Sequence, residues 1–148
     1  MVAATPDNLA HKDVEVIYKN NQKVTSIPFN RGHCELALIL KDSGLKWRPS
    51  VGHYIWDPER KILKKSPFNN RIYYVLNIQH FIKIFSSIET VKRLFIWLPT
   101  YYHSRLICEE LGIEKSLIFE KILSANVKST ADELSVLYNL IITKLNSN

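Results

Sequence analysis

The chain is poor in several residues on which particular classes of protein depend. It has four glycines and two cysteines in 148 residues. A glycine-rich phosphate loop needs several glycines in close succession, so this count nearly excludes one. Two cysteines cannot supply a disulfide framework. We expect Cys34 and Cys108 to be reduced and buried in the core of a protein that resides in the cytoplasm or an equivalent reducing compartment. A single disulfide between them is the alternative.

Long hydrophobic runs and paired metal ligands are also missing. The longest apolar runs, Leu36–Leu40 and Leu94–Leu98, are far shorter than the roughly 20 residues that cross a bilayer. No basic stretch followed by an apolar one opens the chain, so we expect no secretory signal. The sequence has no Cys-x-x-Cys, His-x-x-x-His or Gly-x-Ser-x-Gly. We therefore expect no cofactor, no metal site and no catalytic residue.

Positive charge is what the chain does have, and it is concentrated. The net charge is +6, and Lys41–Arg71 contains eight basic and three acidic residues, which places five of the six net charges there. Aromatic rings lie among these charges, a combination typical of surfaces that bind polyanions. The residues expected to contact a partner are Trp47, Arg48, Tyr54, Trp56, Arg60, Lys61, Lys64 and Lys65.

These residues suggest two kinds of partner. Lysine and arginine neutralise phosphates and aromatic rings stack on unpaired bases, which indicates RNA or single-stranded DNA. Alternate aromatic residues in strands also commonly face the core, and lysines commonly lie in solvated turns. We therefore expect a non-catalytic binding or regulatory module acting through a macromolecular partner, protein or nucleic acid, with nucleic-acid binding as the specific alternative.

A second candidate site lies where a predicted strand at 93–98 meets a predicted helix. The carboxyl end of a strand beside a helix N-terminus is a favoured ligand site, because free backbone N–H groups there attract anions. This corner predicts, as a further alternative, a small enzyme or an anion-binding domain. The alternative is that Tyr101 and Tyr102 bind no ligand and only pack over the edge of the sheet. The residues concerned are Thr100, Tyr101, Tyr102, His103 and Arg105.

Asp42 is followed at a distance by Glu59-Arg60-Lys61. This short pattern resembles that of the PD-(D/E)xK nucleases. In that family two carboxylates hold a divalent metal and the lysine assists the attacking water. Here the Glu-x-Lys follows Pro58 in a predicted turn, whereas the family places it on a strand. The likeness covers only these residues, and we infer no activity from it.

Strand signals occur in three places. Alternation over 13–27 predicts a hairpin with its turn at 20–22. The stretch 53–64 predicts a second hairpin that turns at Asp57-Pro58-Glu59-Arg60. Residues 93–98 are apolar at nearly every position, which predicts a central strand covered on both faces.

Helix signals account for much of the rest. Asn30 and Gly44 bracket a helix over 31–43 with Leu36, Ile39 and Leu40 buried. Further helices are predicted from Asn69 or Asn70 to Phe85, over 101–111 and over 114–125, and from a Thr130–Glu133 capping box to the C-terminus. Ile72–Val75 also suits a strand. The expected fold is α/β or α+β, with a small sheet, about five helices and a helical C-terminal half, as one globular domain over 13–148 behind a loose leader at 1–12.

Overall fold

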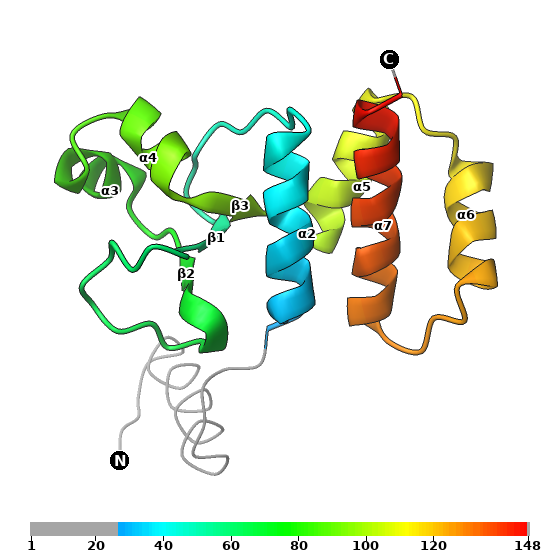
Figure 1. Cartoon of the computed structure of the whole chain (residues 1–148), viewed down its shortest axis with the longest axis horizontal. Coiled ribbons are helices and arrows are strands. Elements are labelled where there is room, and N and C mark those ends of the chain that lie inside the picture. The colour runs from blue at the N-terminus through cyan, green and yellow to red at the C-terminus, as the bar shows by residue number, and fades with distance from the viewer. Residues whose placement is uncertain (1–26, 148) are drawn as a thin grey trace, which may run out of the picture.

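The computed structural model describes residues 27–147, and over this range the chain has an α+β fold (Figure 1). A small antiparallel sheet lies against helices, and the C-terminal half is helical, as predicted. The leader at 1–12 and the predicted hairpin at 13–27, apart from Ile27, lie outside the described residues. The elements are α2 (Arg31–Asp42), β1 (Tyr54–Trp56), η1 (Asn69–Arg71), β2 (Ile72–Tyr74), α3 (Ile78–Ile84), α4 (Ile88–Leu94), β3 (Ile96–Leu98), α5 (Tyr101–Glu110), α6 (Lys115–Ser124) and α7 (Thr130–Leu145).

The sheet has the order β2-β1-β3, and both neighbouring pairs are antiparallel. Ile55 of β1 lies opposite Tyr73 of β2 and Trp97 of β3. The strand predicted at 53–56 is therefore confirmed, but it occupies the centre of the described sheet. The strand predicted as central over 93–98 is shorter, because α4 takes up its first residues. It lies at one edge of the described sheet.

The prediction that residues 61–64 form the second arm of a hairpin over 53–64 is wrong. Residues 61–64 form no strand, and β1 pairs with β2 and β3 instead. The predicted turn at Asp57–Arg60 is present, with the Arg60 N–H directed at the Asp57 carbonyl. The Asp57 carboxylate then accepts hydrogen bonds from the next backbone N–H groups, those of Lys61 and Ile62. A side chain thus takes the donors that a returning strand would give to β1.

Helix α2 matches its prediction closely at both ends. The Asn30 side chain accepts a hydrogen bond from the His33 N–H, while the His33 ring accepts one from the Asn30 N–H, so the two form a reciprocal cap. Gly44 has a φ of 99°, which favours glycine just after a helix. The predicted buried stripe is partly wrong. Leu40 is buried, but Ile39 is 45% exposed, because successive side chains of an α-helix point about 100° apart around its axis and Ile39 is therefore turned away from the direction of Leu40.

The single helix predicted from Asn69 or Asn70 to Phe85 is replaced by three elements. The turn η1, the strand β2 and the short helix α3 follow one another, and the strand alternative at Ile72–Val75 is the one that holds. Asn77 caps α3 through its side chain. Helix α4, capped by Ser87, was not predicted.

Helices α5, α6 and α7 follow their predicted ranges within one residue at most ends. Helix α7 is capped one residue earlier than predicted, because the Ser129 side chain accepts the Asp132 N–H, whereas Thr130 was expected to accept the Glu133 N–H. Tyr138 is fully buried, and its hydroxyl donates to the Pro99 carbonyl at 2.6 Å. Among residues 27–147, no helix combines the length and apolarity needed to cross a membrane.

The two faces of the sheet carry separate hydrophobic clusters, because successive side chains of a strand point to opposite faces. Trp56 joins the cluster of α2, α5 and α7. Ile55 joins the cluster of α3 and α4, with Phe95. Figure 1 shows α3 and α4 on one side of the sheet and α7 and α6 beyond α2 on the other. Cys34 and Cys108 are free thiols buried in the first cluster, as predicted.

Candidate functional site

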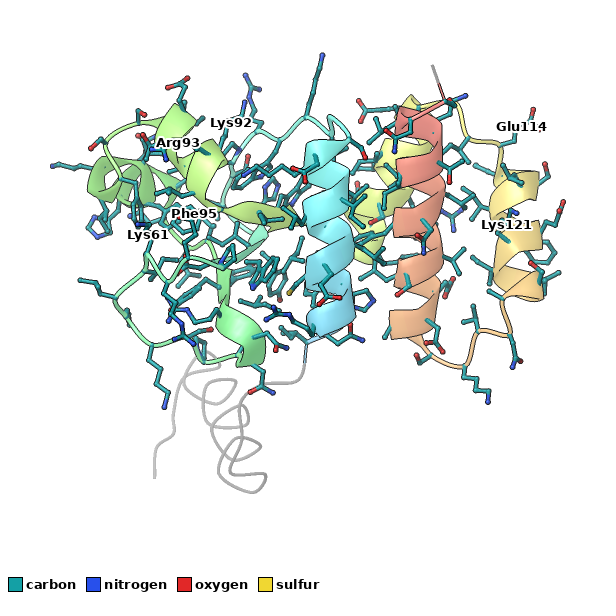
Figure 2. The ribbon with its side chains drawn as sticks, in the orientation of Figure 1. Lys61, Lys92, Arg93, Phe95, Glu114 and Lys121 are labelled. Atoms are coloured by element: carbon teal, nitrogen blue, oxygen red, sulfur yellow. The ribbon has the colours of Figure 1, made fainter. Side chains whose placement is uncertain are left out.

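Charge divides the described chain into two unlike parts. Residues 41–98 contain eleven basic and four acidic side chains, whereas residues 99–147 contain five basic and six acidic ones. Figure 2 shows Lys61, Lys92 and Arg93 on the half that carries the sheet, α3 and α4, and Glu114 and Lys121 on α6 at the opposite end. We call residues 41–98 the basic half. Positive charge therefore predominates in the basic half.

Residues 60–68 form a loop after β1, here called the basic loop, and a buried carboxylate holds the start of this loop in place. Asp57 is fully buried, and its two oxygens accept the N–H groups of Lys61 and Ile62, each at 2.9 Å. The Arg71 guanidinium donates to Asp57 Oδ2 at 2.5 Å and to the Ile62 carbonyl at 2.8 Å. The start of the loop is therefore tied to the residue that precedes β2.

Two further side chains hold the rest of the basic loop. The Tyr73 hydroxyl donates to the Lys64 carbonyl at 2.5 Å. The Ser66 hydroxyl donates to the Ile72 carbonyl and accepts the Phe68 N–H. These bonds hold the backbone of the loop, and Ile62 and Phe68 pack against the hydrophobic clusters, whereas the basic side chains of the loop stay in solvent. Arg60, Lys61, Leu63, Lys64 and Lys65 are all exposed, and Leu63 is 98% exposed.

A large open cavity, here called the apolar groove, lies between the basic loop, β2 and α3. Its volume is about 910 Å³. Ile55, Val75 and Phe81 contribute apolar atoms to its lining, while Lys64 and Lys65 line it from the loop. No carboxylate occurs among the described residues that line it. The groove thus combines an apolar lining with positive charge.

The two tryptophans of the predicted contact set face inward. Trp47 is 9% exposed and Trp56 is 6% exposed. The ring of Trp56 lies in the core beneath the Arg31 guanidinium, 5.1 Å from the ring centroid. Their burial removes the stacking platform on which the prediction of nucleic-acid binding relied. Tyr54 is half-buried against Phe29, so the exposed members of the predicted set are Arg48, Arg60, Lys61, Lys64 and Lys65.

The strand-to-helix corner exists as predicted, between β3 and α5. Thr100 caps α5 and hydrogen-bonds the His103 ring at 3.0 Å. The Tyr101 hydroxyl accepts from Arg105 and donates to Glu133 of α7, so these side chains are engaged in packing the helices. Tyr102 is 67% exposed. The five residues thus form two contact groups, Thr100 with His103 and Tyr102, and Tyr101 with Arg105, and ligand binding at this corner stays a prediction.

His53 was not predicted as a site residue, yet it joins Trp47, Trp97 and His103. Its Nδ1 accepts the Trp47 indole N–H at 3.0 Å, its ring stacks on Trp97 with centroids 4.9 Å apart, and His103 lies edge-on at 5.1 Å. Burial, with a smaller effect from His103, lowers the pKa of His53 to about 4. A neutral ring with an acceptor at Nδ1 carries its hydrogen on Nε2. No spacing signal in the sequence links these four positions.

The nuclease pattern is not assembled as that family requires. Glu59 lies in the turn after β1, and Lys61 gives its backbone N–H to Asp57. Within residues 27–147, no three His, Cys, Asp or Glu side chains gather closely enough to hold a metal ion. Comparison of the chain with protein families, with curated proteins and with solved structures finds no match.

Proposed function

We propose that the protein is a non-catalytic binding module that docks an acidic segment of a partner protein on the basic loop and in the apolar groove. One observation carries the proposal. The backbone of the basic loop is fixed by Asp57, Arg71 and Tyr73, while the side chains that it presents, Leu63 above all, contribute nothing to the core.

The fixed backbone lowers the cost of binding. Ordering a mobile loop on association costs free energy, and a loop already held in one conformation avoids much of that cost. Burying the Asp57 carboxylate also carries a desolvation cost, which its pairing with Arg71 and two backbone N–H groups offsets. The same pairing joins the residues next to β1 and β2, and it holds a loop that leaves Leu63 and four basic side chains exposed for a partner.

The groove indicates the chemistry of the partner. Its volume of about 910 Å³ is within the range of roughly 300–1,000 Å³ typical of ligand pockets, so it has room for apolar side chains. Lys64 and Lys65 beside it complement Asp or Glu residues that flank such an anchor. Neither lysine forms an ion pair with any described residue. Apolar anchoring favours a peptide over nucleic acid, whose backbone offers charge without apolar side chains.

Selection of random peptides on the full chain, followed by affinity measurement, tests the proposal. We expect the selected peptides to share an apolar residue flanked by Asp or Glu, and to lose at least about tenfold in affinity for the variant Lys64→Glu with Lys65→Glu. The matched control is Lys115→Glu with Lys121→Glu on α6, which places the same charge changes in the other half.

Two results would count against the proposal. Selected peptides without acidic residues, or with equal affinity for both double variants, would remove the basic loop from the interface. Saturable binding of short RNA or DNA, weakening steeply with salt and lost in the Lys64→Glu, Lys65→Glu variant, would favour the nucleic-acid alternative.

A further inference from the structure

A second cavity in the basic half shares no described lining residue with the apolar groove. Its volume is about 420 Å³, and it is bounded by α2, the turn after α2, α4 and β3. Three lysines and two tryptophans dominate its lining, and no described carboxylate lines it. We call it the lysine cavity. Its lining includes Lys41, Lys46, Lys92, Trp47 and Trp97.

Lys41 is the fixed member of this set. Its ammonium donates to the carbonyl of Arg93 at 3.0 Å and to that of Phe95 at 3.3 Å, at the C-terminal end of α4. An ammonium has three N–H donors, so one remains after these two bonds. Burial lowers the pKa of Lys41, with Asp42 and Glu59 opposing that effect and Arg93 adding to it. A ligand anion would compensate part of this desolvation.

Lys46 and Lys92 complete the positive set from two different elements. Lys46 follows the C-terminus of α2, and Lys92 lies in the last turn of α4. Both side chains are exposed, and neither is paired with a carboxylate of residues 27–147. Their ammonium groups are therefore available to the same bound anion as the free donor of Lys41.

The aromatic lining is held in place by His53. The Trp47 indole is fixed by its hydrogen bond to His53 Nδ1, and the Trp97 ring is stacked on the His53 ring. Both rings line the cavity at little cost in side-chain entropy, and Trp97, which is half-buried, offers more surface than Trp47, which is 9% exposed. The cavity thus pairs cationic donors with rigid aromatic surface.

We propose that the lysine cavity binds a small phosphorylated ligand with a flat ring, of the nucleoside monophosphate kind. A phosphate monoester carries a charge of about −1.5 to −2 at pH 7, which suits several ammonium groups better than a single carboxylate would. The volume of about 420 Å³ falls within the range of small-ligand pockets. This site is separate from the apolar groove, so the two proposals stand or fall independently.

The three tryptophans provide a site-specific test. Their indole N–H signals in a ¹⁵N-correlated NMR spectrum, assigned with single Trp→Phe variants, are followed as adenosine 5′-monophosphate is added to the full chain. We expect saturable shifts at Trp47 and Trp97, whereas Trp56, which lies in the other cluster, serves as the internal control. Inorganic phosphate and adenosine, each carrying half of the recognition, should bind at least about tenfold more weakly.

Charge variants complete the experiment. Lys46→Gln with Lys92→Gln should weaken adenosine 5′-monophosphate binding by about tenfold or more, and Lys121→Gln on α6 should leave it unchanged. Absence of saturable shifts up to about 5 mM, a typical limit of specific small-ligand binding, would overturn the proposal. Equal binding of phosphate or of adenosine, or undiminished binding by the double variant, would overturn it as well.

Discussion

Asp57 and Arg71 form an ion pair in which Arg71 Nη2 lies 2.5 Å from Asp57 Oδ2, and the carboxylate is fully buried. The pair joins the residue after β1 to the residue before β2, at the point where the Asp57 N–H also bonds the Arg71 carbonyl. One contact thus closes the sheet and holds the first residues of the basic loop. The proposed docking surface depends on it.

Asp57→Asn should therefore destabilise the protein strongly. The change leaves the Arg71 guanidinium without its carboxylate and removes one charge-assisted acceptor, and breaking a buried pair in this way costs about 3 kcal/mol. Denaturant unfolding measures the free energy of unfolding. The control is Glu35→Gln, which breaks the exposed Arg31–Glu35 pair and should cost less than about 1 kcal/mol. Equal effects of the two changes would show that the Asp57–Arg71 pair does not stabilise the fold.

Leu63→Ser should change binding without changing stability. Leu63 is 98% exposed, so the folded state gains nothing from its side chain, and its replacement should alter the free energy of unfolding by less than about 0.5 kcal/mol. Peptides selected for the apolar groove should bind this variant more weakly. A clear loss of stability would instead mean that Leu63 packs against part of the chain, and would weaken its role in docking.

Stability should fall as the pH is lowered from about 6.5 towards 4. The pKa of His53 is about 4 in the folded chain, below its ordinary value of 6.5, so in this window the unfolded chain binds more protons. The stability is fully present above the unfolded pKa and is lost as the pH falls through the window. Burial also lowers the pKa of His33 and of His103, which act in the same direction.

His53→Asn isolates the contribution of His53 to this pH dependence. Asparagine offers an amide oxygen to the Trp47 indole N–H but does not titrate. Thermal unfolding at pH 7.5 and pH 5 should show a smaller loss of melting temperature for the variant than for the parent chain. An unchanged difference would place the proton uptake on His33 and His103 alone.

Tyr138→Phe should cost about 1–3 kcal/mol of unfolding free energy. The Tyr138 hydroxyl donates to the Pro99 carbonyl in a fully buried position, and the change leaves that carbonyl without this donor. This bond fixes the turn between β3 and α5. A variant as stable as the parent chain would mean that the carbonyl finds another donor.

Local signals in the sequence predicted α2, α5, α6 and α7 well. Asn30 caps α2 as expected, Thr100 caps α5, and Gly44 and Gly112 follow the ends of these two helices with positive φ. These signals act over a few neighbouring residues, so they can be recognised without the fold. The strand prediction failed where a side chain and a distant strand take the backbone hydrogen bonds that a neighbouring segment was expected to make.

The basic half illustrates this failure. Residues 61–64 were expected to return as the second arm of a hairpin, but Asp57 takes their first N–H donors, and β2 supplies the strand that pairs with β1. The eight residues expected to contact a partner were chosen from charge and aromatic content alone. Composition locates the positive charge along the sequence, but it could not show that Trp47 and Trp56 face inward, because the alternation of a strand leaves open which face is buried.

The most direct measurement of the docking proposal is an amide chemical-shift map of the full chain with the tightest selected acidic peptide. The account predicts shifts at residues 60–68 and along β2 and α3, which border the apolar groove, with the α6 and α7 signals unmoved. Shifts confined to α5, α6 and α7, with the basic loop unchanged, would contradict it.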